Sequence, residues 1–284
     1  MKNNPTVYRN STLHLSSLLH SPIFASKTTK LKVNCIEVST LSTQNERLVY
    51  KGFPLDTDRD FKLFSAILAK FYQNNKLNEL DNFDRNVVFT KSELYEIAGI
   101  RSNNRNNSVF QSLIGRLENI EQARLTVFKY EEGHNIFDDS KAKKRISFPL
   151  LSKTEYDLDS GILIIILHPD IGSLDYQTFS KQFINMNEYE KLDNQYSKAI
   201  YLYLKTRIFK SSRNVILKVD LNTLRDRMTH SKSMSNREKN RYLKSALMAN
   251  KEIKLFKGFE ILTREGKVKI ILNPPKEEEI ILPM

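Results

Sequence analysis

One order of sequence patterns occurs twice along this chain of 284 residues: an amphipathic helix, a short strand, a helix, a turn, a second helix and a hairpin. The first copy extends over 56–168 and the second over 186–272. A repeated order at this length indicates duplicated units even where the residues differ. Helix, turn and helix followed by a β-hairpin is the order of a winged helix. We therefore predict an α+β fold with two tandem winged-helix domains.

The first half of the chain carries the patterns of the first copy. Two alternating runs, at 30–39 and 46–53, predict a hairpin that Pro54 closes. From Asp56 onward apolar residues recur at three- and four-residue spacing, which predicts an amphipathic helix. The elements expected after it are a strand over 87–89, a helix that begins at the capping box of Thr90 and Glu93 and ends at Gly99, a helix over 107–119, and strands over 125–130, 145–152 and 161–168.

The second half carries the same patterns with different residues. The elements expected there are one long helix over 186–209, a strand over 215–219, a short helix over 221–228 with Asp220 as its cap, a helix from the capping box of Ser235 and Glu238 to about Ala249, and strands over 254–262 and 267–272. We expect four segments, namely a flexible arm at 1–22, a first winged-helix domain at 23–180, a second, DNA-binding one at 181–276, and an acidic tail at 277–284.

The positive charge is concentrated in the C-terminal third. Residues 186–276 contain 21 Lys and Arg against 9 Asp and Glu, a net charge of +12, whereas 1–185 contribute +3 and 277–284 contribute −3. Such an excess predicts attraction to polyanions, although a solvated basic surface would have the same composition.

The second helix of the second copy has the residues of a DNA-recognition helix. Spacings of four and three residues place Arg237, Arg241 and Lys244 on one line, away from an apolar face. Arginine can bind guanine O6 and N7 in a bidentate way, and lysine more often neutralises phosphate. A solvated helix face is the alternative. The candidate DNA contacts of this copy are Arg237, Lys239, Arg241, Lys244, Ser231, Lys232 and Ser235, with Arg264 and Lys267 beside the turn of the hairpin.

The corresponding helix of the first copy is rich in asparagine instead. Asn and Gln can bind adenine edges, but Asn is also a common turn residue. The candidate contacts here are Arg101, Arg105, Asn106, Asn107, Gln111 and Arg116. The basic loop Lys141–Arg145, with Lys143 and Lys144, would suit a wing that lies along phosphates, or solvation alone.

The sequence contains no recognisable catalytic constellation. The phosphate-binding loop motif of ATPases is absent, and the five histidines are not at metal-ligand spacing. The single cysteine, Cys35, excludes an internal disulfide and a Cys-built metal site. Asp56, Asp58 and Asp60 lie at a helix N-terminus, where the helix dipole favours acids. We expect no enzymatic activity, no cofactor, no metal, and no membrane span, because the longest apolar run is short.

Three stretches together resemble a known family. They are LDTDRDFKLF at 55–64, FINMNEYEKLDNQYSKAIYLYL at 183–204, and SKSMSNREKNRYLKSAL at 231–247. Their co-linear order is similar to that of the plasmid replication initiators of the RepC type from IncQ-like plasmids, and more broadly to iteron-binding initiators. The first nineteen residues, the long loop at 131–145 and the glutamate tail depart from that pattern.

The resemblance implies tandem winged-helix domains that bind direct repeats (iterons) in double-stranded DNA, help melt an A·T-rich region and recruit a replicative helicase. The resemblance also implies a primase as a further partner, and self-association of the chain. We expect the protein to be located in the cytoplasm. Arg237, Arg241 and Lys244 would read the repeat, and the 106–116 helix would take an adjacent groove. A winged-helix transcriptional regulator and a nicking replication endonuclease are the alternatives, the first with a two-fold symmetric site and the second with metal-dependent cleavage.

Overall fold

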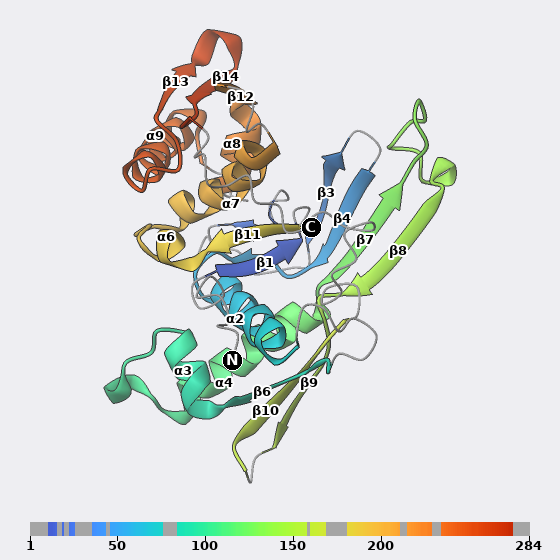
Figure 1. Cartoon of the computed structure of the whole chain (residues 1–284), viewed down its shortest axis with the longest axis vertical. Coiled ribbons are helices and arrows are strands. Elements are labelled where there is room, and N and C mark those ends of the chain that lie inside the picture. Colours follow the sequence, from blue (N-terminus) through green and yellow to red (C-terminus); the bar gives the residue numbers. More distant parts are fainter. Residues whose placement is uncertain are drawn as a thin grey trace, which may run out of the picture.

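The computed structural model places most of the chain in two stacked α/β units. It describes residues 11–15, 19, 23–25, 36–43, 46–75, 84–157, 160–168, 181–210, 215–228 and 234–274. In Figure 1 the second unit lies at the top, the first unit at the bottom, and a further sheet to the right. The acidic tail lies outside the described residues, as do Ser231 and Lys232.

The first unit places three helices on a three-stranded antiparallel sheet with the order β6-β10-β9. Its helices are α2 (Arg59–Asn74), α3 (Lys91–Ile97) and α4 (Asn107–Gln122), and its strands are β6 (Asn86–Thr90), β9 (Leu151–Asp157) and β10 (Ile162–Leu167). The apolar positions of α2 are buried, as the three- and four-residue spacing predicts. The capping box of Thr90 and Glu93 is present at the start of α3, and Gly99 ends the turn after it with a φ of 67°.

The second unit repeats this topology. Its helices are α7 (Gln195–Lys210), α8 (Leu221–Met228) and α9 (Asn236–Glu252), and its strands β12 (Ile216–Asp220), β13 (Gly258–Leu262) and β14 (Lys267–Ile271) have the order β12-β14-β13. The first strand of each unit alternates exposed and buried residues in the same pattern, and its last residue, Thr90 or Asp220, caps the helix that follows. Asp220 accepts a hydrogen bond from the Thr223 amide at 2.8 Å, as expected for a cap. The duplicated winged-helix plan is therefore confirmed.

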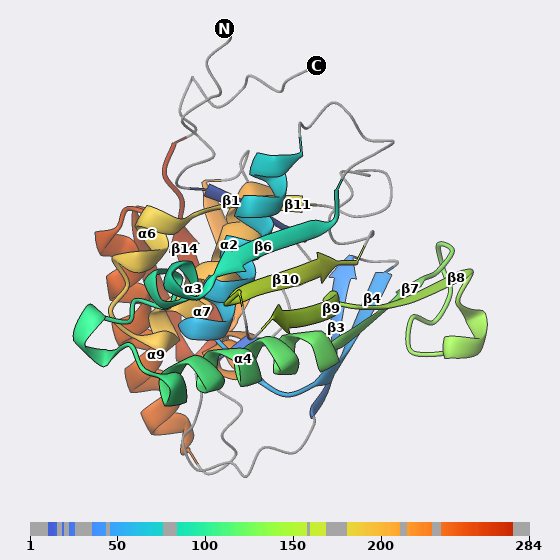
Figure 2. The same cartoon turned by 90° about the horizontal axis from the view of Figure 1, so that it is seen from below.

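A four-stranded antiparallel sheet is inserted into the first unit. It has the order β3-β4-β7-β8, with β3 (Ile36–Thr43), β4 (Glu46–Gly52), β7 (Arg124–Lys129) and β8 (Lys144–Pro149). The predicted hairpin is thus real, but β3 continues to Thr43 through polar residues that the sequence pattern assigned to its turn. Both views show the β7–β8 hairpin extending away from the side that carries α9 (Figures 1 and 2).

That insertion corrects the position of the first wing. The strands that correspond to β13 and β14 are β9 and β10, because each pair supplies the middle and outer strands of its three-stranded sheet. The basic loop Lys141–Arg145 joins β7 to β8 and is not the wing. The expected strand over 145–152 is two strands, since β8 ends at Pro149 and the chain from Leu151 onward pairs with β10 instead of β7.

The helix expected over 186–209 is also two helices. The first, α6 (Met186–Glu190), is capped by Asn185, and the second, α7, is preceded by Asn194, whose side chain accepts from the Ser197 amide at 2.8 Å. The apolar spacing continues into this break because Tyr189, before it, and Leu192, within it, are both buried. In the hairpin, β13 begins at Gly258 rather than at Lys254, because α9 runs to Glu252 and Lys254 adopts a left-handed φ of 62°.

Short strands tie the beginning of the chain to the body. Within the expected arm, β1 (Ser11–Leu15) pairs antiparallel with β11 (Lys181–Asn185). Just after the arm, β2 (Phe24–Ala25) pairs parallel with β5 (Leu55–Asp56). Three short 3-10 turns complete the described elements, and they are η2 (Ser102–Asn104), η3 (Asp139–Lys141) and η4 (Thr263–Glu265). Within the described residues, no helix is long and apolar enough to span a bilayer.

Helix α7 contributes to both hydrophobic cores. Its Tyr201 and Leu202 belong to the core of the first unit, whereas Ile200, Tyr203 and Leu204 belong to that of the second. The two units therefore meet along a helix that they share.

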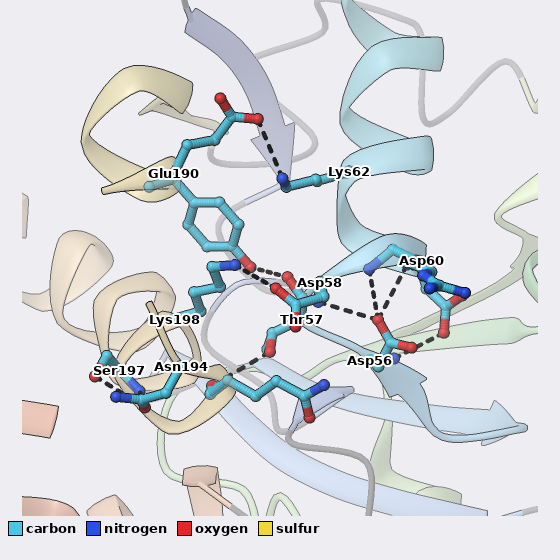
Figure 3. Close-up of polar contacts among 12 residues, drawn as sticks. Asp56, Thr57, Asp58, Asp60, Lys62, Glu190, Asn194, Ser197 and Lys198 are labelled. Atoms are coloured by element: carbon cyan, nitrogen blue, oxygen red, sulfur yellow. Dashed lines mark hydrogen bonds and ion pairs between the residues drawn. The ribbon is translucent and has the colours of Figure 1, made fainter. Parts of the chain in front are cut away.

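Polar contacts fix the start of α7 to the segment before α2 (Figure 3). The Thr57 hydroxyl donates to the carbonyl of Gln195 at 3.2 Å, and Lys198 is ion-paired with Asp58. The Tyr189 hydroxyl donates to the Thr57 carbonyl. These bonds hold the first turn of α7 against the first unit.

Candidate nucleic-acid interface

Helix α9 is held at its start and along one face. The Ser235 side chain accepts from the Glu238 amide and the Glu238 side chain accepts from the Ser235 amide, which completes the predicted capping box. Leu243, Ala246 and Leu247 are buried in the second core. This packing leaves the opposite face of α9 directed outward.

The outward face of α9 carries the predicted basic line. Arg237, Arg241 and Lys244 are exposed, and Lys239 is half-buried. Met248, one turn beyond Lys244, is 41% exposed. The side chains therefore present three cations and one apolar group along one helix face.

Helix α8 is bonded to α9 across the turn of the motif. The Arg225 guanidinium donates to the Asn240 side chain at 2.9 Å and to the Asn222 side chain at 2.8 Å. Arg225 and Asn240 are fifteen residues apart and lie outside the apolar patterns, so nothing in the sequence predicted this bond. It orients α9 relative to α8.

The hairpin of the second unit also exposes basic side chains. Arg264 and Lys267 are exposed on either side of Gly266, whose φ of 63° forms the turn. This hairpin follows the second helix of the helix-turn-helix in the chain and is the wing of the motif.

In the turn between α3 and α4, most of the residues predicted to contact DNA bond to other residues of the protein. Arg105 donates to the Ile100 carbonyl at 3.3 Å and to the Ser92 hydroxyl at 3.1 Å, and lies 3.6 Å from a Glu96 carboxylate oxygen. Asn106 caps α4 by accepting from the Val109 amide at 2.9 Å. The Asn107 side chain accepts from Lys91 at 2.7 Å. These three residues therefore shape the turn.

Arg116 points into the fold rather than toward solvent. One guanidinium nitrogen lies 2.6 Å from a carboxylate oxygen of Asp56 and 2.6 Å from one of Asp60, and the side chain is 15% exposed. Asp56 in turn accepts from the amides of Asp58 and Arg59 at 3.0 and 2.6 Å, so its carboxylate lies at the N-terminus of α2, where the helix dipole favours an acid. Arg116 neutralises these two acids and is unavailable for a groove.

The two carboxyls of this cluster have opposite shifts. Burial alone raises the pKa of Asp56, but the Arg116 charge and hydrogen bond, with backbone amides, outweigh it and leave that pKa below its ordinary value. Burial and the nearby charge of Asp56 raise the pKa of Asp60, and Arg116 only partly offsets them. The Arg116 charge lowers the pKa of both carboxyls.

The exposed side chains that remain on α4 are small or neutral near its start. Ser108, Gln111 and Ser112 are exposed there, and Arg101 is exposed in the preceding turn. Arg116 is the only Lys or Arg in α4. This helix could reach base edges through Gln111 but brings almost no positive charge.

Lys143 and Lys144 are exposed on the β7–β8 hairpin. Lys143 lies 3.0 Å from Glu131, and the Arg145 guanidinium lies 5.4 Å from the centre of the Phe128 ring. In both views this hairpin lies on the side of the molecule opposite α9, whereas α3 and the start of α4 lie on the same side as α9 (Figures 1 and 2). The structure therefore does not bring these two lysines together with the basic face of α9.

Among the described residues there is no group of three or more His, Cys, Asp or Glu that could hold a metal ion. The acids of the α2 start are used by Arg116 and Lys198, as described above.

Comparison with protein families decides the affiliation. A family model described as "Initiator Replication protein, WH1" matches residues 36–205, which is more than half of the chain. The chain belongs to this family of replication initiators. No curated protein matches it significantly.

Solved structures support the fold of this initiator. A crystal structure of domains 2 and 3 of RctB is similar to it with a TM-score of 0.53 and 12% identity, covering 92% of this chain and 99% of the other. The Pi initiator protein in complex with iteron DNA has a TM-score of 0.50 and 14% identity, covering 94% of this chain and 99% of the other. At these identities the likeness shows the fold alone, which is that of tandem winged-helix initiator domains.

Proposed function

We propose that this initiator binds directly repeated sequences in double-stranded DNA at a plasmid origin, with α9 as its main recognition helix. The observation that carries the proposal is the exposed line of Arg237, Arg241 and Lys244 on the second helix of a helix-turn-helix whose other face is buried. In such motifs this helix enters the major groove. The Pi initiator, which has a similar fold, is described in a complex with iteron DNA.

The residues divide into base contacts and phosphate contacts. Arg237 and Arg241 would bind guanine edges, since a planar guanidinium fits guanine O6 and N7. Lys239, Lys244, Arg264 and Lys267 would bind phosphates of the same duplex, with Ser235 at the start of the helix and Ser231 and Lys232 from the sequence before it. These contacts would provide most of the affinity, which would fall steeply with salt.

The first unit would occupy an adjacent groove on the same side of the molecule. Gln111 would contact a base edge there and Arg101 a phosphate, whereas Arg105, Asn106 and Asn107 would maintain the shape of the turn. Two linked helices one helical turn apart would cover a site of about 20 base pairs.

Origin opening would follow from several copies bound to neighbouring repeats. Bending or untwisting of the duplex costs least where the steps are flexible, so an A·T-rich segment would open first. A replicative helicase would then be recruited to that segment. Permanganate footprinting of a supercoiled origin plasmid tests the melting step, and reactivity that does not change at saturating protein would contradict it.

The first experiment is fluorescence anisotropy with two duplexes of equal length and composition. One carries a direct repeat from the DNA that flanks the gene, and the other is a scramble of it. We expect at least about a hundredfold preference for the repeat at physiological salt, within the usual range for specific binding. In Arg241→Ala the preference should fall by about 1–3 kcal/mol, as expected for the loss of one base contact.

Other outcomes point to other functions. Equal binding to both duplexes that fades with salt would leave only a basic nucleic-acid binder. A stable dimer on a two-fold symmetric sequence would indicate a transcriptional regulator. Cleavage of supercoiled plasmid with magnesium would indicate a nicking enzyme.

A further inference from the structure

Arg241 contacts the next residue on its own helix. Its guanidinium carbon lies 4.9 Å from the centre of the Tyr242 ring, and one guanidinium nitrogen donates to the Tyr242 hydroxyl at 3.2 Å. Neighbouring residues on a helix do not normally face each other. The long side chain of Arg241 must therefore turn sideways over the ring, which restricts the direction of its charge.

The Tyr242 ring is itself held from behind. It lies against the Tyr196 ring of α7, with 4.9 Å between centroids and 35° between planes. Both tyrosines are half-buried and pack on the second core. Tyr242 is therefore an amphipathic residue with its ring fixed in the fold and its hydroxyl directed to the arginine.

A hydrogen bond also joins α9 to α7 and fixes the distance between them. The buried Asn250 side chain of α9 donates to the Ser197 carbonyl of α7 at 2.9 Å and to the Ala246 carbonyl of its own helix at 2.8 Å. Ser197 directly follows Tyr196, so the ring pair and this amide bond act on the same turn of α7. The position of Tyr242 is set by α7 rather than by α9 alone.

We infer that Tyr242 is a positioning residue for base recognition, which it serves by holding the Arg241 guanidinium in a restricted orientation on the outer face of α9. The inference rests on the proposed function, because it assumes that Arg241 reads the repeat. Arginine has many rotamers in solution, and a restricted one loses less entropy on forming a bidentate contact. Removal of the Tyr242 hydroxyl should therefore reduce discrimination between sequences without reducing the charge of the helix.

The test is a double-mutant cycle in the full chain, with the repeat and scrambled duplexes as probes. Tyr242→Phe keeps the ring on Tyr196 and removes the hydroxyl, so the repeat preference should fall about two- to tenfold, the size expected for one hydrogen bond. The salt dependence of repeat binding should stay the same, because no charge is lost. In an Arg241→Ala background the same change should alter the preference by less than about twofold.

Controls separate positioning from folding. Tyr130→Phe removes a hydroxyl that has no hydrogen-bond partner among the described residues and lies outside the basic face. The preference of this variant for the repeat over the scramble should therefore match that of the wild type. Thermal unfolding should place Tyr242→Phe close to wild type.

Three results would overturn the inference. If Tyr242→Phe kept the wild-type preference for the repeat while Arg241→Ala lost part of it, Tyr242 would have no positioning role, but the proposed function would stand. An equal loss in the presence and absence of Arg241 would assign Tyr242 a role that does not act through the arginine. A wild-type protein that does not distinguish the two duplexes would remove the proposed function and this inference with it.

Discussion

Helices α4 and α9 occupy equivalent places in the two winged-helix units and have different surfaces. Helix α9 contains five Lys and Arg, of which Arg237, Arg241 and Lys244 form an exposed line. Helix α4 contains one, Arg116, and that side chain is turned inward to two aspartates. Duplication of the topology has therefore not duplicated the charge. An equivalent position in the fold establishes where a helix lies but not how strongly it attracts DNA.

The largest difference should appear in stability when the equivalent arginines are removed. Arg116→Ala leaves two buried carboxyls without their partner and should destabilise the fold by about 3–5 kcal/mol. Arg241→Ala removes an exposed side chain and should change stability by less than about 0.5 kcal/mol. Urea unfolding of both variants at pH 7 measures the difference. Similar values for the two would mean that Arg116 does not neutralise the cluster.

The defect of Arg116→Ala should also depend on pH. In the wild type the pKa of Asp56 is below its ordinary value, so this residue contributes stability above the unfolded pKa that is lost as the pH falls. Without Arg116, burial would raise the folded pKa of both acids above the unfolded value, so stability would be lost as the pH rises through that window. The difference in unfolding free energy between variant and wild type should be largest near neutral pH and should decrease toward pH 4. A gap that widens in acid would contradict this assignment.

DNA affinity should depend on the residues of α9 more than on those of α4, the reverse of the order expected for stability. Arg237→Ala or Arg241→Ala should each weaken repeat binding by about 1–3 kcal/mol and relax the sequence preference, whereas Lys244→Ala, which removes a phosphate contact, should lower the slope of log affinity against log salt by about one. Gln111→Ala on α4 should leave the slope unchanged, because a neutral amide releases no counterion. Anisotropy at three or more salt concentrations measures both quantities. A steeper loss from Gln111 than from Arg241 would reverse the proposed roles of the helices.

Capping residues offer a comparison in which the two helices should behave alike. Asn106→Ala and Ser235→Ala remove a side-chain acceptor from the first turn of α4 and of α9, respectively, and each should cost about 1 kcal/mol of folding stability. Thr at either position, which can still accept the bond, is the conservative control. If only one alanine variant were destabilised, the first turns of the two helices would not be equally held.

The smallest effect concerns the glycine within α4. A Cβ at Gly115 would meet nothing within 4 Å, so Gly115→Ala should stabilise the helix by about 0.5–1 kcal/mol. We expect the affinity for the repeat to stay within about twofold of wild type, because α9 carries the charge. Weakened binding in the stabilised variant would show that DNA approaches α4 closely enough to clash with an added methyl group. The contributions of α4 and α9 to DNA binding would then be more similar than we propose.

Local patterns predicted most of this fold. Apolar spacing identified α2, α4 and α9, and both capping boxes form where Thr90 and Ser235 indicated, because these signals lie within a few residues of one another. The exposed line of Arg237, Arg241 and Lys244 was predictable for the same reason. The wing of the first unit was not, because an inserted hairpin with a basic loop has the same local signals as a wing.

Contacts between distant residues could not be predicted. Arg116 and Asp56 are sixty residues apart, and nothing near Arg116 in the sequence distinguishes an arginine that will face solvent from one that will meet an acid. Likewise, the apolar spacing over 186–209 continues through the break between α6 and α7, where Asn194 caps the second helix. The pattern records which side faces the core but not where the backbone turns.

The shared helix α7 also limits how such a protein can evolve. Its Leu202 packs in the first core while its Tyr203 packs in the second. Recombination between related genes exchanges domains cleanly where the crossover falls in an exposed linker, but a crossover near α7 would join a helix shaped for one pair of cores to a foreign partner. The two units must then be inherited together. A lineage would acquire a new DNA target by substitutions on the outer face of α9 rather than by exchange of a whole unit.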